Sequence, residues 1–133
     1  MTESGGTLVL DAEGLSGWLN EKPRIMAFLA AAHCNQTEVV ASALTILEVS
    51  HGKLDQRRLD WVLSRVRVEP VTERSARSSA SLLIVANLHG HTHAIDSVVA
   101  ELAARQARPV AVLTSDVGDL TRLCPDHVRI VGV

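Results

Sequence analysis

The stretch PVAVLTSDVGDL, residues 109–120, contains the clearest strand of the chain and runs directly into a helix start. Its first half is a short aliphatic run, the kind that is buried in parallel sheets. Similar runs stand at residues 7–10 (TLVL), 38–41 (EVVA), 67–71 (RVEPV) and 128–133 (VRIVGV). Short aliphatic strands that alternate with helices indicate parallel strands joined by right-handed crossovers. The sequence therefore predicts an α/β fold.

Between these strands the chain carries the spacing and capping signals of helices. The helical stretches are residues 12–34 with a break near Pro23, 43–52, 55–66, 73–88 and a last one whose apolar stripe runs from Ile95 to Ala103. Ser42 and Asp55 offer side chains that cap two of the helix starts, and Gly52 marks one end. We expect a three-layer α/β/α sandwich around a central, mainly parallel sheet of four or five strands, with Pro70 at a sheet edge or strand end.

The composition is that of one globular domain with an aliphatic core. Of its 133 residues 47% are hydrophobic and 2% aromatic, so platforms on which bases stack are few. The formal net charge of -2 provides no global field that attracts nucleic acid. The apolar runs are too short to span a bilayer, and residues 1–6 do not resemble a signal peptide. We expect a cytoplasmic protein with no membrane partner, a flexible tail at residues 1–6 and one domain at 7–133.

Several acids stand where the predicted sheet would bring them to one edge. Asp11 and Asp116 directly follow strands, Asp96 lies in the first turn of the striped helix, and Asp119 lies one turn beyond Asp116. Glu48 lies in mid-helix among apolar residues, which predicts a buried carboxylate. Ligands of open parallel sheets bind at the carboxyl ends of the strands, so this edge is the candidate site.

Each acid also has an ordinary structural interpretation. Asp116 and Asp119 can cap a helix, Asp96 can complement a helix dipole, Asp11 can be a turn residue, and Glu48 can have a buried arginine partner. Taken together, however, clustered carboxylates repel one another unless a cation neutralises them, and their pKa values rise. Oxygen ligands suit Mg²⁺ or Mn²⁺, which activate water in phosphoryl transfer. The joint pattern indicates a metal-dependent phosphodiesterase site.

Four segments, in this order, resemble the PIN-domain ribonucleases, in particular the VapC-type toxins of toxin–antitoxin pairs: LVLDAEGLS, ALTILEVSHG, AIDSVVAELA and VLTSDVGDL. The resemblance covers nearly the whole chain from Thr7. It assigns the catalytic quartet to Asp11, Glu48, Asp96 and Asp116, metal binding to Asp11, Asp96, Asp116 and Asp119, and supporting hydroxyl groups to Thr114 and Ser115. The chain departs from the family at Glu13 and Gly14, where Ser or Thr is frequent two residues after the first Asp.

The resemblance implies a PIN-like fold and a metal-dependent endoribonuclease that uses Mg²⁺, with Mn²⁺ as a substitute. It further implies RNA products with a 5′-phosphate and a 3′-hydroxyl, a homodimer, and inhibition by a cognate VapB-type antitoxin. A PIN-like interaction module with weak or no catalysis is the alternative. A phospho-receiver domain shares the topology, but it requires a lysine after a late strand, and the only lysines here are Lys22 and Lys53.

The stretch HGHTHAID, residues 89–96, carries three histidines at alternate positions before Asp96. Gly90 and the nearby helix start predict a loop, in which alternate residues do not share one side. Because no second His or Cys cluster supplies further ligands, a zinc or copper site is not favoured. We expect the histidines to shape the loop that leads to Asp96, with His91 as the supporting residue near a phosphate or the helix start.

Two further groups allow more than one interpretation. Six arginines cluster in mid-chain, either on a solvated helix face or on a surface for RNA or a partner: Arg57, Arg58, Arg65, Arg67, Arg74 and Arg77. Trp18 and Phe28 are expected in the core, although this region lines the antitoxin groove in VapC-like proteins.

Overall fold

A computed structural model describes residues 5–133 of the chain. Residues 1–4, most of the expected N-terminal tail, lie outside the described residues. The carbonyl groups of Gly5 and Gly6 accept hydrogen bonds from the Thr37 hydroxyl group (3.0 Å) and the Glu38 backbone N–H (3.1 Å). These two glycines are therefore joined to the start of a neighbouring strand.

The elements follow the order that the aliphatic runs and helix signals predict. The strands are β1 (Thr7–Leu10), β2 (Glu38–Ser42), β3 (Arg67–Glu69), β4 (Val110–Thr114) and β5 (Val128–Gly132). The helices are α1 (Ala12–Leu19), α2 (Pro23–Cys34), α3 (Ala43–Val49), α4 (Gln56–Leu63), α5 (Glu73–Ala86), α6 (Gly90–Ala104) and α7 (Val117–Leu123). None of these helices is long and apolar enough to cross a membrane, within residues 5–133.

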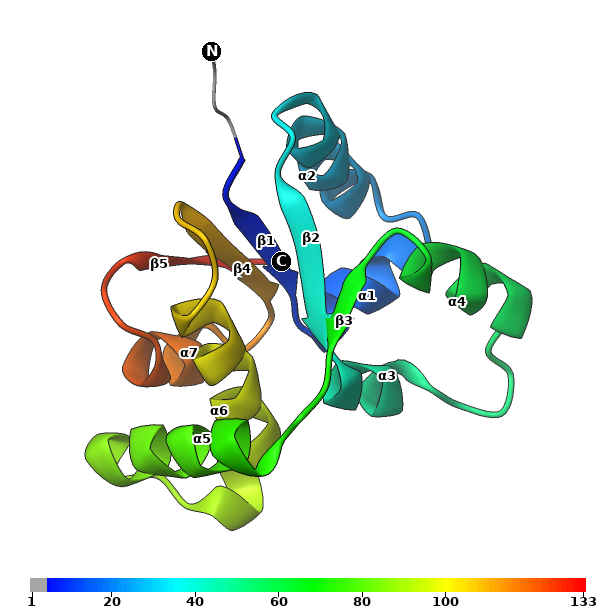
Figure 1. The fold of residues 1–133 in the computed structure, drawn as a ribbon. Coiled ribbons are helices and arrows are strands. Elements are labelled where there is room, and N and C mark those ends of the chain that lie inside the picture. The colour runs from blue at the N-terminus through cyan, green and yellow to red at the C-terminus, as the bar shows by residue number, and fades with distance from the viewer. Residues whose placement is uncertain (1–4) are drawn as a thin grey trace.

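The five strands of residues 5–133 form one sheet in the order β3-β2-β1-β4-β5, with every neighbouring pair parallel (Figure 1). β3 is an edge strand, as Pro70 predicted. From β1 the chain first builds outward through β2 and β3, then returns to add β4 and β5 on the other side. The order therefore reverses between β1 and β4, and such a switch point opens a crevice at the carboxyl ends of the strands.

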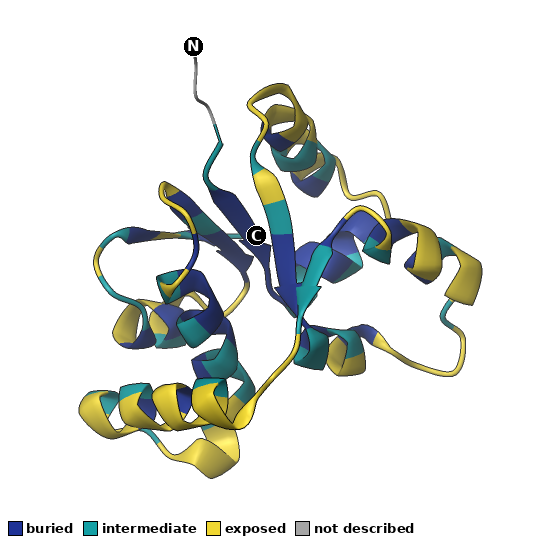
Figure 2. Ribbon diagram, viewed as in Figure 1, coloured by how far each residue is buried: buried dark blue, intermediate teal, exposed yellow. Residues whose placement is uncertain are grey.

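Two apolar cores lie on opposite faces of the sheet, which makes the expected three layers. Leu8 and Leu10 of β1 pack with α1, α2 and α4, whereas Val9 packs with α5, α6 and α7. Figure 2 shows the resulting pattern, with buried strands in the middle and exposed outer surfaces on the helices. Alternate side chains of a strand point to opposite faces, so a continuous aliphatic run is buried on both.

Local capping explains where several helices begin. The Ser42 hydroxyl accepts a hydrogen bond from the Leu44 N–H, and Asp55 accepts from the N–H groups of Arg57 and Arg58, as their positions predicted. Helix α3 ends at Val49 rather than at Gly52.

The expected burial of Glu48 on α3 is wrong. Leu47 beside it is 69% exposed and Glu48 is itself exposed, because only one side of this short helix, with Thr45 and Val49, packs on the protein. The apolar sequence of α3 therefore does not mark a helix buried on all sides.

Candidate metal centre

Asp11 and Thr114 meet at the switch point between β1 and β4. Asp11 follows β1 and is only 6% exposed, and Thr114 ends β4 and is fully buried. The Thr114 hydroxyl donates a hydrogen bond to Asp11 Oδ2 (2.8 Å) and accepts one from the Asp116 backbone N–H (2.9 Å). Thr114 therefore joins the two acidic segments that follow these strands.

Asp116 stands at the N-cap position of α7, but its side chain makes no capping hydrogen bond. Residue Asp116 is exposed and lies just beyond the carboxyl end of β4. Its negative charge raises the pKa values of Asp11, Glu48 and Asp96. A cap that leaves the carboxylate uncommitted keeps that group available for a ligand.

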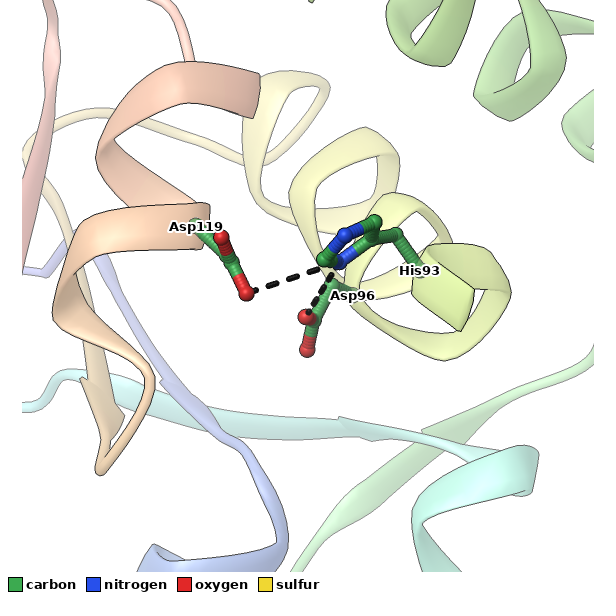
Figure 3. Close-up of side chains that lie close together, drawn as sticks. All are labelled: His93, Asp96 and Asp119. Carbon is green, nitrogen blue, oxygen red and sulfur yellow. Dashed lines mark ion pairs between the residues drawn. The ribbon is translucent and has the colours of Figure 1, made fainter. Parts of the chain in front are cut away.

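His93, Asp96 and Asp119 form a second group at the same edge, between α6 and α7 (Figure 3). The Nδ1 atom of His93 lies 3.7 Å from Asp96 Oδ2 and 3.4 Å from Asp119 Oδ2. One ligand atom from each residue lies within 4.8 Å of the others. This spacing is compatible with a shared cation, for which all three residues provide nitrogen or oxygen donors.

The histidine stretch is not the loop that its sequence predicted. Residues 90–93 form the first turn of α6, and the helix kinks at His93, whose φ and ψ are -117° and 20°. The kink lets the imidazole lie beside Asp96, three residues further on, whereas His91 is exposed and outside this group. The structure therefore brings His93, not the expected His91, to the acids; the i, i+3 spacing to Asp96 was the signal in the sequence.

Burial and mutual repulsion disfavour the charged forms of three acids. Loss of hydration, followed by repulsion from Asp116, Asp11 and Asp119, raises the pKa of Asp96 to about 6, while nearby His93 lowers it. Burial is also the largest cause that raises the pKa of Asp11, against the Thr114 hydrogen bond that lowers it. Repulsion was the expected cause of such shifts, but withdrawal from water contributes more to both.

Glu48, on α3, lies close enough to the other acids for their charges to act on it. Partial loss of hydration, and then repulsion from Asp11, Asp96 and Asp116, raises the pKa of the Glu48 carboxyl to about 7. Within residues 5–133 no Lys or Arg side chain forms an ion pair with any of these acids, so the proposed arginine partner of Glu48 is not present there. The negative charge at this edge thus has no Lys or Arg counter-ion among the described residues.

The two departures from the family pattern have separate explanations. Glu13 turns to Lys22, with 2.8 Å between Oε2 and Nζ. Gly14 lets α1 pack closely on the sheet, because an added Cβ would lie 3.2 Å from Leu10 Cδ2 and 3.3 Å from Leu113 Cβ. The hydroxyl group that bonds to Asp11 comes from Thr114 instead. Ser115 is exposed and lines a hollow that also contains Glu48.

Four of the six mid-chain arginines contact local partners. Arg67 contacts Glu38 and Glu69, and Arg77 pairs with Glu73 on the surface of α5. Arg58 and Arg65 lie over the ring of Trp61, at 5.2 Å and 5.3 Å from its centroid. These cations are held by local partners, which favours defined contacts over a diffuse basic surface.

No protein-family model and no curated protein matches the sequence. Among solved structures, this chain is similar to a chain in the "Crystal structure of VapBC2 from Rickettsia felis bound to a DNA fragment from their promoter". The TM-score is 0.68 at 16% sequence identity, over 96% of this chain and 98% of that chain. The likeness covers nearly the whole chain, and the chain therefore has a PIN-like α/β fold.

Proposed function

We propose that this chain is a metal-dependent endoribonuclease and the toxin of a VapBC-type pair. One observation carries the proposal: Asp11, Glu48 and Asp96 have raised pKa values at the switch point of a parallel sheet, without a Lys or Arg partner among residues 5–133. Uncompensated carboxylates at such a position favour a bound cation. The structural likeness to a chain of the VapBC2 complex supports the toxin assignment.

The donor set fits Mg²⁺, with Mn²⁺ as a substitute. Asp11, Asp96, Asp116 and Asp119 supply hard oxygen ligands, and His93 adds one nitrogen, a ligand that Mn²⁺ accepts more readily than Mg²⁺. When bound, such an ion lowers the pKa of water and neutralises charge on a phosphodiester.

The protein groups then divide the remaining tasks. Thr114 fixes the orientation of Asp11 through its 2.8 Å hydrogen bond to Asp11 Oδ2. Glu48, with a pKa raised to about 7, exchanges a proton near neutral pH and is the candidate general base for the attacking water. The reaction would hydrolyse an RNA phosphodiester to leave a 5′-phosphate and a 3′-hydroxyl.

Cleavage of single-stranded RNA by purified protein tests this function. We expect cleavage with Mg²⁺ or Mn²⁺, none with EDTA, and loss in Glu48→Gln and Asp96→Asn. Asp60→Asn, which changes an exposed acid on α4, is the matched control and should cleave like the wild type. Unchanged cleavage in EDTA contradicts the metal mechanism. No cleavage, together with no Mn²⁺-dependent rise in Tm, favours the alternative of an interaction module.

A groove between α1, α2 and α4 is the proposed antitoxin site. Its volume is about 540 Å³, and its walls include Trp18, Leu29, Trp61 and Arg65. Trp61 is 46% exposed and stands edge-on to the buried Trp18, with 6.2 Å between ring centroids. An apolar helix segment that also carries acids would match these walls. Coexpression with a cognate VapB-type antitoxin should yield a complex, and Trp61→Ala should weaken it.

We also propose that the protein forms a homodimer, as its resemblance to the VapC-type toxins implies. Light scattering at micromolar concentration measures the mass directly, and a monomer would contradict this part of the proposal.

A further inference from the structure

A pocket of about 350 Å³ opens between α2 and the sheet, at the amino ends of the strands. Its walls include Thr7 and Val110, with which β1 and β4 begin, whereas the acids follow the carboxyl ends of these strands. The length of β1 separates the two places by roughly 13 Å, at about 3.3 Å for each residue. Figure 1 shows α2 beside the amino end of β2, away from α3 and α7. The pocket is therefore separate from the candidate metal centre.

The connections between the strands explain why this space is open. The chain passes from β3 to β4 through α5 and α6, and from β4 to β5 through α7, and these three helices pack on the other face of the sheet. Ala111 of β4 and Val131 of β5 therefore form a wall of the pocket on the α2 face. Phe28, Ala31 and Ala32 of α2 form the facing wall. Most of the lining is thus apolar.

Arg129 gives the pocket a positive charge without a counter-ion among the described residues. Its side chain makes no hydrogen bond or ion pair within residues 5–133. Within the same residues, no Asp or Glu lines the pocket. The planar guanidinium group binds a carboxylate through two parallel hydrogen bonds. The charge at this pocket therefore favours an anion.

His127 provides a second, independent observation. It lines the pocket, and its Nε2 atom is buried without a hydrogen-bond partner within residues 5–133. Such atoms are rare in folded proteins and point to a missing partner. Because the χ2 torsion of a histidine is soft, the ring can turn this nitrogen toward a group that enters the pocket. The hydroxyl groups of Thr7 and Thr37 on the same walls, by contrast, already donate to backbone carbonyl groups.

We propose that this pocket binds a small monocarboxylic acid with an apolar body, whose carboxylate pairs with Arg129. One arginine balances the single charge of a carboxylate. A phosphate monoester carries nearly two negative charges at neutral pH, and the excess charge would lie beside apolar walls. Phe28 and Val131 provide surface for an alkyl or phenyl body. The volume accommodates roughly a dozen non-hydrogen atoms, if each takes the space of one water molecule. This binding does not depend on the proposed nuclease function.

Titration with compounds that share one body tests the preference for a carboxylate. 3-Phenylpropionate, 3-phenylpropanol and 3-phenylpropylamine differ only in the end group, and backbone amide NMR signals report where each one binds. We expect 3-phenylpropionate to shift the signals of Ala31, Arg129 and Val131 with a Kd on the order of 1 mM. This Kd should be about tenfold lower than that of the alcohol, and the amine should bind most weakly. Equal Kd values, shifts confined to other parts of the protein, or no shift at about 10 mM overturn the proposal.

Arg129→Gln tests the binding group. The Kd of 3-phenylpropionate should rise about tenfold, to that of the alcohol, and the Kd of the alcohol should not change. Arg57→Gln is the matched control, because Arg57 is exposed on α4, its guanidinium group has no partner within residues 5–133, and it does not line the pocket. An unchanged Kd of 3-phenylpropionate in Arg129→Gln overturns the proposal.

Ala31→Phe tests the place. Ala31 is exposed and lines the pocket, so a phenyl side chain can fill the space without entering the core, and both the acid and the alcohol should lose about tenfold or more in affinity. Ala30→Phe is the matched control, because Ala30 is the exposed neighbour on α2 that does not line the pocket. Unchanged binding in Ala31→Phe contradicts the assignment. Gly5 also lines the pocket, so binding of the acid only to a chain without residues 1–4 would make that segment the occupant and overturn the proposal.

Discussion

The Thr114 hydroxyl makes two hydrogen bonds that hold the centre of the site together. It joins Asp11 to Asp116, and Thr114 and Asp11 are 103 positions apart in the sequence. Asp11 thereby keeps one oxygen bound even without a metal, which partly offsets the cost of burying its charge. Asp96 and Glu48 have no such hydroxyl donor among residues 5–133, and burial together with repulsion raises the pKa of Asp96 to about 6 and that of Glu48 to about 7.

Asp96→Asn should stabilise the metal-free protein. The substitution removes one charge of a repelling group at nearly constant volume, and one pKa unit corresponds to about 1.4 kcal/mol, so we expect a gain on the order of 1 kcal/mol in EDTA. The same change should abolish cleavage and reduce the rise in Tm that Mn²⁺ gives the wild type. Paired thermal melts measure both effects. A destabilised variant with an undiminished Mn²⁺ response would make Asp96 a structural residue of the helix start.

His93→Ala should weaken metal binding, whereas His91→Ala should not. The His93 ring lies 3.4 Å from Asp119 and 3.7 Å from Asp96, close enough to bind the ion or orient its ligands. Loss of such a neighbour costs roughly tenfold or more in metal affinity. Mn²⁺ titration calorimetry of both variants gives the comparison. Equal affinities would place His93 outside the metal centre, and a bound zinc lost on His91→Ala would restore the zinc site that the sequence disfavours.

At the scale of elements, the packing of α1 positions Asp11, which precedes it, and one wall of the hollow that Glu48 and Ser115 also line. Gly17 lets α1 cross close to α2, because a Cβ at this position would overlap Cγ1 of Ile25. Gly14 allows the same close approach to Leu10 and Leu113. The glycines of α1 are therefore required by neighbouring side chains and not by an unusual backbone conformation.

Gly17→Ala should destabilise the protein by about 1–3 kcal/mol, because Ile25 must move from a close-packed position. Gly118→Ala is the matched control: it also lies in a helix, α7, but an added Cβ meets nothing within 4 Å. Alanine favours helices over glycine, so the control should be unchanged or more stable by up to about 1 kcal/mol. Urea unfolding of the two variants measures the difference, and equal stabilities would show that α1 and α2 adjust freely.

At the scale of the whole molecule, the parallel sheet gathers carboxylates from four separate segments, and this makes stability depend on pH. The folded pKa values of about 6 for Asp96 and about 7 for Glu48 exceed the ordinary carboxyl range near 4. Between these values the folded protein binds more protons than the unfolded chain, so its stability falls as pH rises.

Metal-free protein should therefore lose stability as pH rises from about 4 to about 7, and Mn²⁺ should remove much of this dependence. Thermal melts across this range, with EDTA and with Mn²⁺, measure the slope. The double variant Glu48→Gln, Asp96→Asn is the control and should have a flatter profile in EDTA. A wild-type slope equal to that of the double variant would show that these two acids do not carry the effect.

The strands, the helix starts and the order of the acids follow from local patterns that the sequence contains in full. The aliphatic runs define β1 and β4, and a side chain such as Ser42 or Asp55 caps its own helix within three residues. A strand followed at once by an acid is also a local pattern, and parallel topology places such acids at one sheet edge. The position of Asp11 and Asp116 at one edge of the sheet could therefore be predicted from the sequence.

Only the tertiary structure decided the exposure of Glu48, the contacts of His93 and the contacts between segments far apart in the chain. Glu48 is exposed although its helix is apolar, because burial depends on which side of a helix meets the sheet. His93 reaches Asp96 and Asp119 through a kink in α6, a backbone change that alternate histidines do not encode. The bond from Thr114 to Asp11, and the hollow between α1 and the segment after α3, depend on distances between segments far apart in the chain. Local propensity sets each element, but the relative positions of distant side chains arise only when the two cores pack.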